Sequence, residues 1–128
     1  MDRALSMLIA GAFVFTVATP AFAKVETLKG QLIDQSCYKM DKANTGERHT
    51  MRRGPVDNCA TDCAKEGRPV ALLTCDGKVY QVTGDLAANK NDKLAPHMTH
   101  TVEVTGDVST AQDGTMQTAD ATLKMVSK

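Results

Sequence analysis

The chain has 128 residues, with 15 Lys and Arg against 15 Asp and Glu, so its formal net charge is zero. This length accommodates one domain, and a neutral chain lacks the basic surplus that drives non-specific binding to nucleic acid through counterion release. The composition therefore argues against a nucleic-acid-binding protein.

The first 23 residues have the pattern of a secretory signal peptide. Arg3 gives a positive start, an apolar run of 15 residues follows, and Ala-Phe-Ala forms a small-x-small cleavage box before Lys24. The run is shorter than the roughly 20 residues that a membrane-spanning helix needs. We therefore expect residues 1–23 to be removed and residues 24–128 to form one domain, periplasmic or secreted and without membrane attachment. Disulfides are permitted in such a compartment.

Hydrophobic alternation and turn residues predict five strands in the rest of the chain. The predicted strands are 25–34, 70–75, 78–83, 101–108 and 116–126. Gly30 predicts a bulge or sharp bend in the first strand. Asp76-Gly77 predicts a hairpin with a type I′ turn, and Asp113-Gly114 predicts a second hairpin turn.

The connection between the first two of these strands contains a predicted loop and a predicted helix. Residues 35–56 are rich in charge and lack periodicity, which indicates a long loop. Loops of this length are uncommon in compact domains unless they are functional or fastened down. Residues 58–66 are predicted to form a short helix that Asp57 or Asn58 caps and Gly67 ends.

The order of elements favours a mainly β fold, a small five-stranded OB-like barrel with one or two short helices. Residues 84–96 would form a short helix or irregular crossover before the fourth strand. A small two-sheet sandwich is the alternative. Residues 24–128 supply only 17 Val, Leu and Ile and no Trp, so the core is thin. A crosslink or a bound metal ion would therefore matter for stability.

Cys59 and Cys63 lie four residues apart in the predicted helix, so both thiols project from one face. Their Cβ atoms would be roughly 5 to 6 Å apart, whereas a disulfide needs about 3.5 to 4.5 Å. Two sulfurs bound to one zinc ion need only come within roughly 4 Å of each other. The pair is therefore better suited to a shared ion, or to two outside partners, than to a bond of its own.

Cys37 and His49 are the candidate outside ligands, since both lie in the predicted loop. Together with Cys59 and Cys63 they make a Cys3His set, one of the usual four-coordinate structural zinc combinations, and an ion there would fasten the loop. Because thiolates also suit Cu(I), and Met40 and Met51 are near in the sequence, the ligand set does not by itself choose between zinc and copper.

Two disulfides are the alternative for the four cysteines of this exported domain. If Cys59 and Cys63 do not bond to each other, two pairings are left. Cys37 pairs with Cys59 and Cys63 with Cys75, or Cys37 pairs with Cys63 and Cys59 with Cys75. A mixed state with one disulfide and leftover ligands is also open.

The remaining candidate groups carry weaker signals. Cys75 precedes the Asp-Gly turn and is either a buried filler or a disulfide partner. His97 and His100 flank Met98 and can form a second copper or nickel site, although histidines at such a turn are more often ordinary surface residues.

Sequence motifs for catalysis are absent. The chain has no C-x-x-C, G-x-S-x-G, H-E-x-x-H or phosphate-binding loop. Asp34, Cys37 and His49 have the residue types of a Cys-His-Asp arrangement, but spacing alone does not show the low thiol pKa that a nucleophile needs. We therefore expect a protein that is not an enzyme.

Several short motifs resemble a family of small exported bacterial proteins with no characterised activity. The motifs are Gly30-Gln31-Leu32-Ile33-Asp34, Cys37-Tyr38, Cys59-Ala60-x-x-Cys63-Ala64, Asp76-Gly77-x-x-Tyr80 and Val102-x-Val104-x-Gly106. The resemblance covers residues 30–108 and implies an OB-like strand set. It also implies that Cys37, His49, Cys59 and Cys63 belong to one shared feature, to which Cys75 is additional.

These observations lead to one expectation and one alternative. We expect an exported, non-catalytic metal-binding protein whose Cys37, His49, Cys59 and Cys63 hold zinc or Cu(I), either for structure or for periplasmic metal handling. The alternative is a disulfide-stapled module that binds a protein or small ligand on the barrel face, with Tyr38 and Tyr80 as its aromatic anchors.

Overall fold

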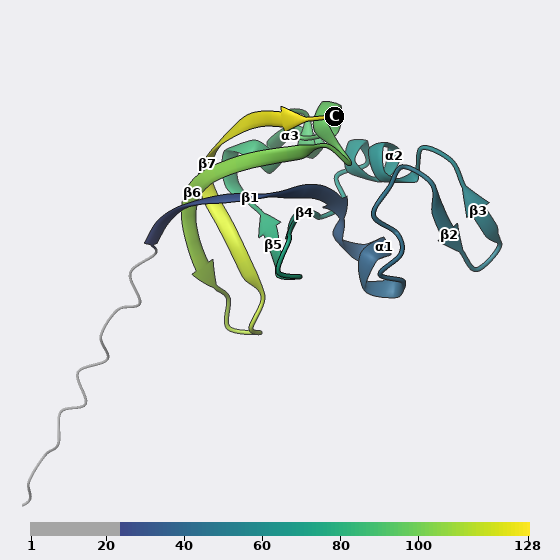
Figure 1. Ribbon diagram of the computed structural model, residues 1–128, viewed down its shortest axis with the longest axis horizontal. Coiled ribbons are helices and arrows are strands. Elements are labelled where there is room, and N and C mark those ends of the chain that lie inside the picture. The colour runs from purple at the N-terminus through teal and green to yellow at the C-terminus, as the bar shows by residue number, and fades with distance from the viewer. Residues whose placement is uncertain (1–23) are drawn as a thin grey trace, which may run out of the picture.

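The computed structural model describes residues 24–128, so the predicted signal peptide lies outside the described residues. Five strands form a closed barrel in the order β1-β4-β5-β7-β6 (Figure 1). Their bounds are β1 Lys24–Asp34, β4 Val70–Thr74, β5 Val79–Val82, β6 Thr101–Thr110 and β7 Met116–Ser127. The predicted five-stranded, mainly β barrel is confirmed, and the two-sheet sandwich is wrong.

The barrel closes because β1 pairs with two strands. Its first part runs antiparallel to β6, from Lys24 opposite Val108 onward, and its last part runs antiparallel to β4, ending with Asp34 opposite Val70. The one parallel contact joins β5 to β7. The crossover that makes this contact feasible lies between β5 and β6 and contains η1 Gly84–Ala87, α3 Ala88–Asn91 and η2 Ala95–His97. This is the strand order of an OB-like barrel, and closure pairs the edges of this five-stranded sheet with each other.

Gly30 lies in the overlap where β1 pairs with both neighbours. A Cβ atom at this position would be 2.3 Å from the carbonyl oxygen of Leu73. Only glycine lets β1 and β4 approach each other this closely. The position where the sequence predicted a bulge or sharp bend is therefore a point of close backbone approach.

Aliphatic side chains from the strands fill the barrel. Leu32, Leu72, Val102 and Val104 are fully buried. Ala60 and Ala64 of helix α2, Cys59–Lys65, belong to the same cluster, so this helix packs against the barrel with its alanine face. The absence of large side chains on that face brings α2 close to β1, whose end carries the candidate site.

The predicted loop at residues 35–56 is wrong, because this segment contains helix α1, Gln35–Met40, and a hairpin of β2, His49–Met51, and β3, Gly54–Val56. Figure 1 shows the hairpin projecting away from the barrel beyond α2. These elements are too short to produce a periodic pattern. Asp34 nucleates α1 as its N-cap, since its Oδ1 accepts the backbone N–H of Cys37 at 3.0 Å.

Helix α2 is confirmed, but its predicted cap is wrong. Asn58 occupies the N-cap position in a left-handed conformation and makes no side-chain cap bond. Glu47 takes over this role, because its carboxylate accepts the backbone N–H and the hydroxyl of Thr61, and its carbonyl accepts the N–H of Cys59. The predicted stop at Gly67 is confirmed by its positive φ of 86° and the bond from its N–H to the carbonyl of Ala64.

Both Asp-Gly pairs form hairpins, but the type I′ turn predicted for Asp76-Gly77 is wrong. Only Gly77 has positive φ, and Thr74 and Lys78 close a three-residue loop around it. Such a loop combines a type I turn with a glycine in the left-handed region. Gly114 ends the β6–β7 turn in the same way. Within residues 24–128, no helix combines the length and apolar character needed to span a membrane.

Candidate metal centre

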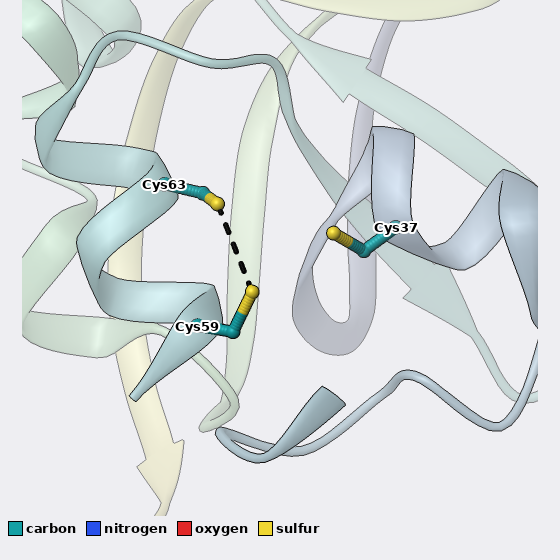
Figure 2. A group of neighbouring side chains, drawn as sticks. All are labelled: Cys37, Cys59 and Cys63. Carbon is teal, nitrogen blue, oxygen red and sulfur yellow. Dashed lines mark hydrogen bonds between the residues drawn. The ribbon is translucent and has the colours of Figure 1, made fainter. Parts of the chain in front are cut away.

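Three thiols from two helices converge at the end of the barrel. The Sγ atoms of Cys37, Cys59 and Cys63 all lie within 4.8 Å of one another. Cys37 comes from α1, and Cys59 and Cys63 come from successive turns of α2 and face it (Figure 2). The sulfurs of Cys59 and Cys63 are 3.9 Å apart. This separation is too long for a disulfide and close to the roughly 4 Å expected for two sulfurs on one zinc ion.

His49 and Asp34 form a second group of donors with Cys37. One ligand atom from each of Asp34, Cys37 and His49 lies within 4.8 Å of the other two. His49 is 1% exposed, and both its ring nitrogens are buried without a hydrogen-bond partner among the described residues. The Oδ2 atom of Asp34 is likewise buried and unpartnered there. Because buried polar groups are normally hydrogen-bonded or bound to a metal, a metal ion here would supply the partner that these atoms need.

The two groups of donors overlap at Cys37. The predicted ligands Cys37, Cys59 and Cys63 form one group, and the predicted ligand His49 joins Cys37 in the other. Asp34 is a fifth donor that the sequence analysis did not assign as a ligand. The signal for Asp34 in the sequence was its position three residues before Cys37. As the N-cap of α1, Asp34 accepts the backbone N–H of Cys37, so its carboxylate lies near that residue.

Asn44 holds the elements that carry Cys37 and His49. It is 2% exposed, and its Nδ2 donates to the carbonyl of Cys37 at 3.2 Å and to that of Thr50 at 3.4 Å. Its Oδ1 accepts the N–H of Thr50 at 2.9 Å. One buried amide thus ties α1 to β2, and each of these elements supplies a donor.

The thiols of Cys37 and Cys63 are protonated at neutral pH when no ion is bound. Burial, followed by the charge of the neighbouring Asp34 carboxylate and of Cys59, raises the pKa of Cys37 to about 12. The pKa of Cys63 is raised by burial and by the same carboxylate. A cation among these groups would offset the negative charge that disfavours the thiolates, so its binding would release protons.

The other candidates lie outside this centre. Cys75 is exposed and free, so both expectations for it are wrong. The rings of His97 and His100 lie 6.4 Å apart, but no third His, Cys, Asp or Glu in the described part of the chain completes a metal group with them. Tyr80 is 8% exposed and belongs to the barrel core, so it is not a surface anchor.

The four cysteines test the alternative in which they form two disulfides. All four cysteines lie within residues 24–128 and are free there. Both two-disulfide pairings require Cys75 to bond with Cys59 or Cys63, yet Cys75 is not part of the thiol group. The arrangement can hold a metal ion through its Cys and His side chains.

Comparison with known protein families, with curated proteins and with solved structures finds no match. The resemblance to a family of exported bacterial proteins therefore stays a prediction.

Proposed function

We propose that the protein is an exported, non-catalytic metal-binding protein in which Cys37, His49, Cys59 and Cys63 hold zinc or Cu(I). The observation that carries the proposal is the 3.9 Å separation of the Cys59 and Cys63 sulfurs beside the Cys37 thiol, with the orphaned His49 imidazole next to it. Soft sulfur donors with one imidazole are the ligand chemistry of both ions.

The bound ion would crosslink α1, β2 and α2. These short elements have few buried aliphatic side chains of their own, and the described ion pair between Arg48 and Asp57 is exposed. Exposed ion pairs contribute little to stability. Burial of Cys37, Cys59 and His49 supports a structural or metal-handling role.

Asp34 supports the same centre in the proposed function. Its Oδ1 positions Cys37 and its Oδ2 is buried without a partner, and a carboxylate oxygen of Asp34 lies within 4.8 Å of the ligand atoms of Cys37 and His49. Asp34→Asn keeps an N-cap acceptor but removes the negative charge. We expect this variant to fold and to bind the ion about 10- to 100-fold more weakly, the usual effect of losing a group that supports metal ligands. Competition with a coloured chelator measures the affinity for the ion. An affinity equal to that of the wild type would show that Asp34 does not contribute to the centre.

Native mass spectrometry of the purified protein tests the proposal. We expect one retained ion, and loss of that ion in His49→Ala and Cys59→Ala. Cys75→Ala and His97→Ala are matched controls outside the centre and should keep the ion. Unchanged metal content in both site variants would refute the ligand assignment. A metal-free protein with the mass of two disulfides would favour the stapled module.

The first residue of the recovered protein tests the export part of the proposal. We expect protein recovered from the periplasm or medium to begin at Lys24, the first residue after the predicted cleavage box. Recovery of a soluble form that begins at Met1 would contradict the export part of the proposal without affecting the metal centre.

A further inference from the structure

The methionines of residues 24–128 fall into two groups. Met98 is buried in the barrel core, and Met116 and Met125 pack against it. Met40 and Met51 do not belong to that core, and Met40 is 60% exposed. Filling the hydrophobic interior, the usual role of methionine, does not account for these two side chains.

Met40 and Met51 lie on the two elements that supply Cys37 and His49. Met40 is one turn beyond Cys37 on α1, and Met51 is two residues beyond His49 on β2, so each shares a face with a donor. On each element the donor is buried while the methionine is more accessible. Both methionines line a single cavity of about 400 Å³, together with Arg52, Arg53 and Val56.

Building on the proposed function, we infer that Met40 and Met51 form an outer docking site that captures Cu(I) and passes it to the buried thiol centre. Thioethers are soft ligands that suit Cu(I), whereas zinc is held by thiolate, imidazole and carboxylate. Two thioethers make a weak site and three thiolates make a stronger one, so transfer runs from the methionines to the thiol centre. Of zinc and Cu(I), the two ions that the donor set permits, the two thioethers therefore favour Cu(I).

The charges around the cavity favour the same ion. Arg52 and Arg53 form the turn of the β2–β3 hairpin, and none of the described ion pairs includes either of them. Their repulsion of a divalent cation is twice that of a monovalent one at equal distance. They also attract an anionic carrier, so Cu(I) delivered as an anionic complex is the best match for this surface.

Cu(I) transfer kinetics test the inference. The reduced, metal-free protein is mixed without oxygen with the coloured, anionic bicinchoninate complex of Cu(I), and loss of colour reports transfer. In the double variant Met40→Leu with Met51→Leu, which changes shape little, we expect transfer to slow about tenfold, a barrier raised by about 1.4 kcal/mol. The final Cu(I) affinity and the rate of Zn²⁺ uptake should equal those of the wild type.

Met116→Leu with Met125→Leu is the matched control and should transfer Cu(I) at the wild-type rate. Wild-type rates in the Met40 and Met51 variant would overturn the docking site while leaving the metal centre intact. An equal slowing of Zn²⁺ uptake would also overturn it, because the effect would then not depend on thioether chemistry. A wild-type protein that takes up neither ion would overturn both proposals.

Discussion

The barrel and the connection between β1 and β4, residues 35–69, bury different kinds of side chain. The barrel buries aliphatic groups such as Leu32, Leu72 and Val104. Apart from two alanines against the barrel, the connection buries Cys37, Cys59, His49 and two side-chain amides. Burial of aliphatic groups is stabilising by itself, whereas buried polar groups stabilise only when they have partners. The barrel therefore holds itself together, and the connection depends on what its polar groups bind.

Removal of the ion should produce the largest effect, and it should loosen the connection while the barrel stays folded. At an ion concentration 1,000-fold above Kd, binding adds about 4 kcal/mol to the free energy of unfolding. Chelation should abolish this increment and expose the connection to protease while the barrel keeps its β-sheet signal. Limited proteolysis and circular dichroism, with and without chelator, measure the two regions. Simultaneous loss of both signals would contradict the comparison.

Leu72→Ala should act on the barrel alone. Truncation of this fully buried side chain removes aliphatic contacts and leaves a cavity, which we expect to cost about 3 kcal/mol of unfolding free energy. The loss should be the same with and without the ion, since Leu72 lies in the barrel core. Denaturant unfolding of both forms gives the two values, and a loss confined to the metal-bound form would show that the regions are coupled.

Asn44→Ala should act on the connection. The substitution removes the Asn44 partner of the Thr50 N–H and carbonyl and one of the two donors to the Cys37 carbonyl, which keeps the N–H of Asp41, at a cost of about 2 kcal/mol. Because Asn44 ties α1 to β2, we also expect weaker metal binding. Hydrogen exchange should increase in residues 35–57 and stay unchanged in the barrel. Exchange that increases equally in β6 would place Asn44 in the barrel's cooperative unit.

The smallest effect is expected at the β4–β5 turn. The Thr74 hydroxyl and then the Lys78 N–H hold the pKa of Asp76 below its ordinary value of 3.8. A lowered pKa means that the charged form stabilises the folded state above pH 3.8, and that this contribution disappears as the pH falls through the lowered pKa. Asp76→Asn should therefore lower Tm slightly at neutral pH, and the difference from wild type should vanish in acid. A difference that persists in acid would assign the effect to packing.

The barrel could be predicted from the sequence because its signals are local and repeated. Alternating valines marked β6, and Asp-Gly pairs marked two hairpins. The type I′ turn was wrongly predicted because the dipeptide also fits a three-residue loop, and only backbone pairing decides between the two.

The candidate centre was only partly predictable. Helical spacing located Cys59 and Cys63, and residue type proposed Cys37 and His49. Asp34 was not assigned as a donor, because its role depends on where β1 ends and α1 begins. The β2–β3 hairpin was not predicted because its strands of three residues are too short to show alternation. The Glu47 cap was not predicted because it joins residues 14 positions apart in the sequence.

The pairing of β1 with β6 also sets the order in which the protein matures. Lys24 lies opposite Val108, so the first strand has to wait for a partner made more than 80 residues later. All four cysteines leave the ribosome before that partner does. Before the barrel closes the thiols lack the burial that they have in the folded protein, so after export an oxidant would reach them. The chance of trapping a wrong disulfide is therefore greatest before the barrel closes, and faster closure would protect the centre.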